Sequence, residues 1–407
     1  MGVISAAQYN HFMISSAQID DMYSAIPTSQ KQYDNLSNSA LSRGIDRYTS
    51  AEYDGAVTEF RRAIALSSFS DNAAKAYDYM AKAYLQDGNT EAAIKTYQEA
   101  IKSYPTRAAF HISLGDIYYK QGQLSEAEAE YKAAINLDSE STDSRYGLGQ
   151  VYLNSERASE AEAQFKKVVS LSPRSSIGYY GLGQTYRKMG NYSDALTQLD
   201  KAVSLDRSFD DGFLEQGYTY ADMGDMDNAR SLVNTLSDNR SSLAGTLREY
   251  IYANAAPKIS LAYSTNNFKS SLGPGTPVAD LDSSLSEIQA SKAFTMRFSF
   301  TKDMDPVSIQ NPLNWGISRA TGTNAGGAYN WGMPASATDV VFPSLPAGVV
   351  YDPETFSADV TFKITQNSEG NGTIDPSHMM FRFYGKDAYG KAMDLAADEY
   401  SGISEIA

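Results

Sequence analysis

A repeat with a period of 34 residues runs between residues 36 and 256, and it constrains the fold more than any other feature. Each repeat has a small residue near its start, mostly glycine, and an alanine twelve positions later. The small residues are Gly44, Ala81, Gly115, Gly149, Gly183 and Gly217, and the alanines are Ala56, Ala93, Ala127, Ala161, Ala195 and Ala229. Each series advances by 37 residues once and then by 34 residues four times. This periodicity predicts helical hairpins that stack into an α-solenoid.

The residue types at the repeated positions explain why the hairpins should stack. Small residues let the two helices of a hairpin approach closely, and a large apolar residue four positions after each alanine fills the gap between hairpins. These large residues are Phe60, Tyr97, Tyr131, Phe165, Leu199 and Val233. Because a single hairpin cannot bury both of its faces, we expect six stacked hairpins over residues 36–256, with residues 243–253 as a capping helix.

The third, fourth and fifth repeats resemble the tetratricopeptide repeat. They contain Leu114-Gly115-Asp116-Ile117-Tyr118, Leu148-Gly149-Gln150-Val151-Tyr152 and Leu182-Gly183-Gln184-Thr185-Tyr186. The resemblance implies protein–protein contact through a groove that is lined by the first helix of each hairpin. The groove residues that it implies are Ile112, Tyr119, Lys120, Tyr146, Gln150, Tyr180, Gln184, Arg187, Lys188 and Tyr218.

Two interpretations of this groove stay open. The rings anchor an extended segment or an amphipathic helix of a partner, or some of them only pack the inner face. One subset of the family grips a terminal carboxylate with Lys and Asn side chains, partly at the sixth repeat position. Here that position holds Ser42, Tyr79, Ser113, Gly147, Gly181 and Glu215, so this clamp is not expected.

The composition changes at Pro257. Residues 264–292 are rich in Ser, Gly, Asn and Pro, so a strand followed by a linker is predicted for 257–292. Apolar residues then alternate with polar ones over 293–300, 356–364 and 379–384. Alternation with a period of two predicts antiparallel strands, and residues 293–407 are expected to form a β-sandwich.

Two motifs in this part resemble bacterial Ig-like domains of the S-layer and cell-surface type. They are Phe298-Ser-Phe-Thr-Lys-Asp-Met-Asp305 and Asp387-Ala-Tyr-Gly-Lys-Ala-Met-Asp394, in which Gly-Lys replaces the family's Gly-Asn. The resemblance implies an Ig-like fold that serves as a spacer, an adhesive module or an assembly module. Catalysis is rare in that family.

Residues 1–35 read as a lead-in segment. Phe12, Met13, Ile19, Met22, Tyr23 and Ile26 recur roughly at helical spacing. Pro27 is expected to end this helical stretch. The segment is either a helix that docks on its own chain or an arm that packs on another subunit.

Composition excludes several functions. The chain has no cysteine and only three histidines, which leaves little material for thiol chemistry or a metal site. A net charge of −15 without a basic stripe argues against nucleic-acid binding, and no apolar run is long enough to span a bilayer. Asp303, Asp305, Asp375 and Asp387 are candidate calcium ligands, but turn capping is favoured. No catalytic, cofactor or metal residues are predicted.

The sequence therefore predicts a non-enzymatic scaffold built from an α-solenoid and an Ig-like β-sandwich. Its expected partners are proteins, with other copies of the chain as candidates. A bacterial surface or secreted structural protein that assembles into filaments is the favoured version, although residues 1–8 resemble no cleaved signal peptide. The alternative is an intracellular or periplasmic adaptor that binds a peptide segment.

Overall fold

The computed structural model describes residues 16–266, 268–322 and 327–401, with side chains from residue 30 onward. The chain divides into two compact units, Met1–Thr219 and Tyr220–Ala407. The division falls inside helix α11, which spans Asp210–Asp222. Of the helices described, none is long and apolar enough to cross a membrane.

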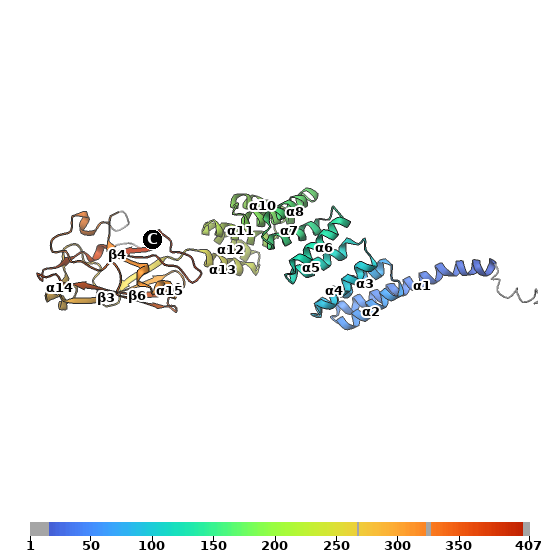
Figure 1. The fold of residues 1–407 in the computed structure, drawn as a ribbon, viewed down its shortest axis with the longest axis horizontal. Helices are drawn as coiled ribbons and strands as arrows, with labels where there is room; N and C mark the ends of the chain where they lie inside the picture. Colours follow the sequence, from blue (N-terminus) through green and yellow to red (C-terminus); the bar gives the residue numbers. More distant parts are fainter. Residues whose placement is uncertain (1–15, 267, 323–326, 402–407) are drawn as a thin grey trace, which may run out of the picture. The chain divides into compact units, whose positions relative to one another are not determined.

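The first unit is entirely helical in the residues described. Its helices before α11 follow one another as antiparallel hairpins (Figure 1). They are α1 (Ser16–Thr49), α2 (Tyr53–Leu66), α3 (Asp71–Gln86), α4 (Thr90–Ser103), α5 (Ala108–Lys120), α6 (Leu124–Leu137), α7 (Thr142–Asn154), α8 (Ala158–Leu171), α9 (Ser176–Lys188) and α10 (Tyr192–Leu205). The predicted helical solenoid is therefore present.

The periodic glycines lie where the two helices of a hairpin meet. A Cβ atom built on Gly149 would lie 2.6 Å from Cε1 of Phe165, and one built on Gly183 would lie 2.5 Å from Cγ of Leu199. Phe165 and Leu199 are fully buried. The 34-residue spacing thus reflects close packing of a large residue against a position that has no side chain.

Helix α1 differs from the prediction for residues 1–35. It runs without a break from Ser16 to Thr49, so Pro27 does not end the helix and that prediction was wrong. A proline removes one backbone hydrogen bond but keeps a helical φ, so a long helix can pass through it at a cost of about 3 kcal/mol. Phe12 and Met13 lie outside the described residues, as do the side chains of Ile19, Met22, Tyr23 and Ile26.

The second unit begins with two helices and continues into antiparallel sheets. The helices are α12 (Met226–Asp238) and α13 (Leu243–Asn254). One sheet has the order β1 (Ile259–Ser264), β3 (Ser291–Phe300), β6 (Ser357–Thr365) and β5 (Gly348–Asp352). Another has the order β4 (Trp315–Arg319), β8 (Met379–Phe383) and β9 (Glu399–Ser401), and a short pair joins β2 (Thr276–Pro277) to β7 (Thr373–Ile374).

One hydrophobic core joins the four-stranded and three-stranded sheets. The ring centroid of Phe298 on β3 lies 5.3 Å from that of Trp315 on β4 and 5.4 Å from that of Phe381 on β8. All three side chains are almost fully buried. The alternation predicted for 293–300 is confirmed, because every second residue of β3 from Phe294 onward is buried.

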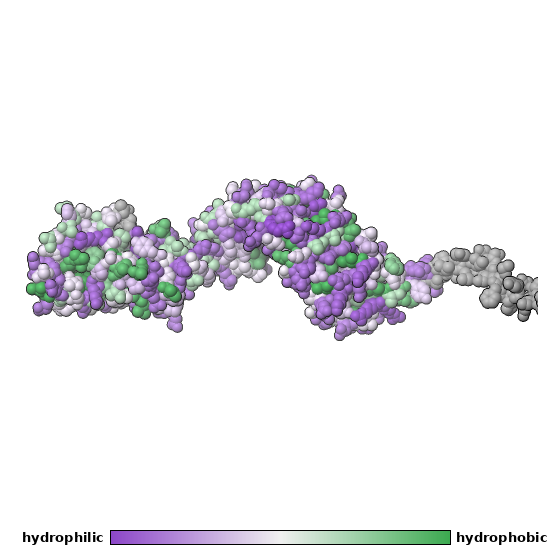
Figure 2. Space-filling model, viewed as in Figure 1, coloured by the Kyte–Doolittle hydropathy of each residue, from purple (hydrophilic) through white to green (hydrophobic). Residues whose placement is uncertain are grey.

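The strand predicted within 257–292 is present as β1, but the rest of that segment, predicted as a linker, belongs to the β-domain, by which we mean residues 257–401. Strand β1 pairs with β3, and Phe268, Val278 and Leu285 are buried in the shared core. Turn-forming residues separate these apolar side chains irregularly, so no periodic pattern reveals the burial. Figure 2 shows a mostly hydrophilic surface on the helices and scattered apolar patches on the visible face of the β-domain.

Candidate functional site

The predicted groove residues lie on the first helices of successive hairpins. We call their common surface in the first unit the A-helix face. Ile112, Tyr119 and Lys120 belong to α5, Tyr146 and Gln150 to α7, Tyr180, Gln184, Arg187 and Lys188 to α9, and Tyr218 to α11. Because the helices repeat every 34 residues, equivalent positions lie on the same side of the stack.

A row of hydrogen bonds connects neighbouring repeats along this face. Nε2 of Gln150 donates to Oε1 of Gln184 at 2.9 Å, and Nε2 of Gln184 donates to the hydroxyl of Tyr180 at 3.0 Å. The two glutamines occupy equivalent positions, 34 residues apart. Asn154 makes a similar link, because its Nδ2 donates to the hydroxyl of Tyr119 at 2.8 Å. Amide and phenol groups thus follow one another from repeat to repeat.

The tyrosine rings are half-buried and pack against the core as well as facing outward. The ring centroid of Tyr146 lies 5.6 Å from that of Phe165, and the centroid of Tyr180 lies 5.0 Å from that of Phe209. Burial raises the pKa of Tyr146 to about 12 and raises the pKa of Tyr180 well above its ordinary value. Both phenols are therefore neutral at physiological pH, so they offer hydrogen bonds without charge.

The two cations of α9 are engaged by the chain itself. Nε of Arg187 lies 2.5 Å from Oε1 of Glu215, whose side chain is only 5% exposed. The guanidinium also lies over the ring of Tyr218, 5.4 Å from its centroid. Nζ of Lys188 donates to the backbone oxygen of Leu153 at 3.2 Å. Sequence reasoning missed Glu215 as a partner, although it lies one repeat after Gly181 at the sixth position.

The remaining predicted residues differ in role. Ile112 is partly buried and packs against the hydrophobic cluster formed by residues of α6 to α9. Lys120 is exposed at the end of α5. The A-helix face therefore combines supporting apolar side chains with outward polar groups.

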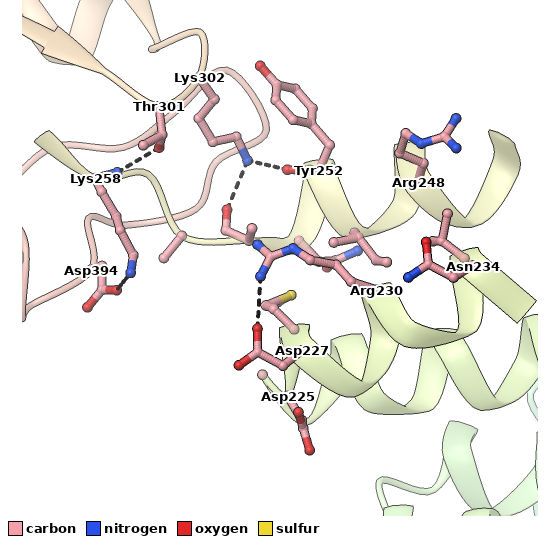
Figure 3. A pocket seen from close by; sticks show the side chains of 17 residues that line it. Asp225, Asp227, Arg230, Asn234, Arg248, Tyr252, Lys258, Thr301, Lys302 and Asp394 are labelled. Carbon is pink, nitrogen blue, oxygen red and sulfur yellow. Dashed lines mark hydrogen bonds and ion pairs between the residues drawn. The ribbon is translucent and has the colours of Figure 1, made fainter. Parts of the chain in front are cut away.

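A different kind of polar site lies in the second unit, where α13 meets the β-domain. The ammonium of Lys302 donates to the backbone oxygens of Tyr252 and Ala255 at 2.5 and 2.9 Å, and it lies 2.6 Å from Oδ2 of Asp387 (Figure 3 shows Lys302 and Tyr252). The rings of Tyr252 and Tyr389 pack edge to face with centroids 5.8 Å apart, and these centroids lie 4.9 and 5.0 Å from Nζ. We call this arrangement the Lys302 junction.

The Lys302 junction unites the two motifs of the β-domain. Lys302 belongs to the first motif and Asp387 to the second, and Met304 forms a β-bridge with Asp387. The side chains of Lys302 and Asp387 are 3% and 0% exposed. The ammonium also lies at the C-terminal end of α13, where free carbonyl oxygens favour a cation. The motifs thus hold the β-domain to α13.

A cleft of about 1,090 Å³ lies beside this junction (Figure 3). It is lined by four cations, Arg230, Arg248, Lys258 and Lys302, and by three carboxylates, Asp225, Asp227 and Asp394. Arg230 pairs with Asp227 at 3.1 Å, and Lys258 pairs with Asp394 at 3.3 Å. Two ion pairs thus lie along the wall of the cleft.

The four candidate calcium ligands have structural partners. Asp303 accepts a hydrogen bond from the hydroxyl of Tyr351 at 2.6 Å, and Asp305 accepts one from the backbone N–H of Val307 at the start of a short helix. Asp387 pairs with Lys302. In the described part of the chain, no group of three or more His, Cys, Asp or Glu side chains could hold a metal ion.

Asp375 lies with Ser377 and His378 in a buried cluster. Oδ2 of Asp375 lies 2.7 Å from Nδ1 of His378, and the hydroxyl of Ser377 donates to Oδ1 at 2.7 Å. A nucleophilic triad needs the serine at the opposite ring nitrogen from the carboxylate. Here the serine hydroxyl lies 3.0 Å from the same Nδ1, and all three side chains are at most 2% exposed. The arrangement suits a structural role.

Comparison with known families supports the repeats. Residues 41–108, 79–142, 112–176 and 176–209 match models of the tetratricopeptide repeat. The chain therefore carries tetratricopeptide repeats in this region, as its motifs predicted. The comparison with curated proteins found no relative of this sequence.

Several solved structures are similar in fold to part of the chain. A tetratricopeptide repeat protein from Parabacteroides merdae ATCC 43184 is 15% identical with a TM-score of 0.48, covering 53% of this chain and 86% of that chain. The pilF protein of Pseudomonas aeruginosa is 19% identical with a TM-score of 0.44, covering 54% and 98%. YrrB, described as a TPR protein with an unusual peptide-binding site, is 22% identical with a TM-score of 0.36, covering 47% and 97%.

Proposed function

We propose that the protein is a non-enzymatic scaffold whose A-helix face binds an extended segment of a protein partner. The observation that carries this proposal is the hydrogen-bonded row from Gln150 through Gln184 to Tyr180, which spans consecutive repeats on one face. The tetratricopeptide repeats support it, because stacked helical hairpins form extended surfaces for other polypeptides.

The chemistry of this row suits a peptide backbone. Each glutamine amide offers donors and an acceptor, and a neutral phenol offers both. An extended segment presents backbone N–H and C=O groups. Hydrogen bonds from the row to these groups can replace the hydrogen bonds that its side chains make to one another. Half-buried Tyr146 and Tyr180 add ring surface that is already held in place, so little side-chain entropy is lost on binding.

The paired charges limit what the A-helix face selects. Arg187 is neutralised by Glu215, and its guanidinium is held against Tyr218. A partner segment therefore gains little from a charge at this point. Recognition through backbone bonds and apolar contacts is favoured over recognition of a terminal carboxylate.

The proposal is tested with a peptide selected on the full chain from a phage-displayed random library. The double variant Gln150→Ala and Gln184→Ala should weaken its binding about tenfold or more in calorimetry, because the backbone partners are lost. Gln98→Ala is the matched control, since Gln98 also donates to a tyrosine hydroxyl, at 3.3 Å, but lies on a second helix, α4. Equal affinities of the double variant and the wild type would refute the proposal.

For the second unit we propose an Ig-like β-sandwich that serves in a bacterial surface or secreted assembly, with the chain associating with its own copies. The support is the pair of motifs that meet at the Lys302 junction and the antiparallel sheets with a shared core. Residues 1–26 would supply an arm in this assembly.

Fractionation of the source cells, with sizing of the purified chain, tests this finer proposal. Recovery in an extracellular fraction of high mass supports it, whereas a cytoplasmic monomer supports the alternative, an adaptor that holds a peptide. Deletion of residues 1–26 tests the arm, which would be discarded if light scattering showed the same assembly.

A further inference from the structure

Strand β5 forms one edge of the four-stranded sheet and, among the strands that the structure describes, pairs only with β6. Its central side chain, Val350, is 68% exposed, whereas the side chains of Val349 and Tyr351 point inward and are each 8% exposed. An exposed edge strand presents unpaired backbone groups to any strand that can lie beside it.

The register of the sheet shows which backbone groups of β5 face outward. The backbone N–H of Thr265 donates to the backbone oxygen of Thr295 on β3. The backbone N–H and C=O groups of odd-numbered β3 residues therefore point toward β1, and those of even-numbered residues point toward β6. The backbone groups of odd-numbered β6 residues must then point toward β5. The hydrogen bond from the N–H of Ala347 to the backbone oxygen of Thr361 confirms this.

It follows that Val350, opposite Asp359, bonds toward β6. The N–H and C=O groups of Val349 and Tyr351 point away from the sheet. Within the part of the chain that the structure describes, no hydrogen bond is made to these four backbone groups.

The region that leads into this edge carries almost no charge. Between Arg319 and Asp352 the sequence contains one charged residue, Asp339, although a fifth of all residues are charged. Asp339 is itself occupied, because its Oδ2 accepts from Nδ2 of Asn330 at 2.8 Å. A chain with a net charge of −15 repels its own copies, so close approach is least costly where charges are absent.

We infer that two copies of the chain pair through β5, antiparallel and about a two-fold axis at Val350. This inference rests on the self-association in the proposed function and identifies its surface. Val349 of each copy then lies opposite Tyr351 of the other, and each such pair exchanges both backbone hydrogen bonds. Val350 meets the other copy's Val350 on the exposed face, as a close apolar pair.

The local sequence is compatible with this register. Asp352 lies opposite Gly348 of the other copy, so the two carboxylates do not face each other. Pro346 and Pro353 flank the strand and confine the pairing to β5. Because the contact is isologous it closes on itself, and it joins the two four-stranded sheets into one. The inference therefore predicts a dimer from this edge.

Sedimentation velocity of the full chain over a range of concentrations tests the inference. Val350→Lys places two ammonium groups side by side at the axis and should raise the dimer dissociation constant at least about tenfold. Val350→Thr, which keeps a branched uncharged side chain, should change it less than about threefold. Tyr263→Lys is the matched control, since Tyr263 is 44% exposed on β1 at the opposite edge, and it should leave the dimer intact.

The outcomes separate this inference from the proposal on which it rests. If the wild type and Val350→Lys associate equally, or if Tyr263→Lys alone prevents association, the β5 edge is overturned and self-association stands. If the wild type stays monomeric at every concentration, both are overturned, while peptide binding by the A-helix face is unaffected. Circular dichroism checks that each variant is folded, as expected for substitutions at exposed side chains.

Discussion

The A-helix face and the Lys302 junction both bring polar side chains of different elements into contact, but under opposite conditions. On the A-helix face the groups are neutral amides and phenols, half-buried and linked in a row. At the Lys302 junction a single ammonium is almost fully buried against one carboxylate. Burial and charge therefore decide whether a polar contact fixes the structure or stays available for other interactions. The junction fixes structure, whereas the face is the surface that we propose for a partner.

The largest expected effect comes from breaking the buried pair. Lys302→Met leaves Asp387 buried without its cation and removes the donors to Tyr252 and Ala255. The free energy of unfolding of the second unit should fall by about 3–5 kcal/mol, measured by urea denaturation.

Lys258→Met is the control for this effect. Lys258 pairs with Asp394 at 3.3 Å in the same unit, but its side chain is 54% exposed. Its loss should cost less than about 1 kcal/mol. Similar losses for the two variants would contradict the distinction between buried and exposed pairs.

A second prediction concerns the packing beneath the A-helix face. Gly149→Val adds a side chain where even a Cβ would lie 2.6 Å from the ring of Phe165. The free energy of unfolding of the first unit should fall by about 1–3 kcal/mol in thermal denaturation.

Gly245→Ala is informative by contrast. Gly245 lies in α13 and has no atom within 4 Å of an added Cβ. This variant should be stabilised by up to about 1 kcal/mol, because alanine favours a helix. A Gly149→Val protein as stable as the wild type would show that the periodic glycines are not packing positions.

A smaller change in stability is expected on the A-helix face itself. Gln184→Ala removes two side-chain hydrogen bonds, to Gln150 and to Tyr180, but water can replace them at a half-buried position. The free energy of unfolding should change by less than about 1 kcal/mol while peptide affinity falls. If stability fell as far as in Lys302→Met, the row would be structural and the comparison would fail.

The smallest expected effect comes from ionisation of the Tyr146 phenol, which leaves the free energy of unfolding unchanged at neutral pH. Burial raises its pKa from 10.0 to about 12, so between these values the folded chain binds a proton that the unfolded chain has lost. Its contribution to stability is complete below pH 10 and is lost as the pH rises through 12. Between pH 10 and 12, the free energy of unfolding should therefore fall less steeply with rising pH for Tyr146→Phe than for the wild type, as measured by urea denaturation at each pH.

The sequence predicted the helical part well for a physical reason. Hairpin packing requires a small residue against a large one in every repeat, and Gly149 with Phe165 shows this requirement directly. The same period predicted that the residues of the A-helix face lie on the first helices of successive hairpins. The bond between Gln150 and Gln184 could have been inferred from their 34-residue separation, because equivalent positions are neighbours in a stack.

Other features depended on contacts that no local pattern records. Lys302 and Asp387 are 85 residues apart and meet only because two loops of the β-domain converge on α13. The burial of Phe268 and Val278 was missed because glycine and proline around them indicated a linker. The prediction that the helix ends at Pro27 used only the local preference of proline, and one proline does not determine the end of a long helix.

Site-specific photo-crosslinking in cells tests the central claim most directly, that the A-helix face contacts another polypeptide. A benzoylphenylalanine at Tyr180 keeps an aromatic ring on that face, and the same group at Tyr192 lies on α10, a second helix of the same hairpin. We predict a discrete crosslinked protein from position 180 that is lost in the Gln150→Ala and Gln184→Ala background, and none from position 192. Crosslinking from position 192 alone, or equal products from both positions, would contradict the account.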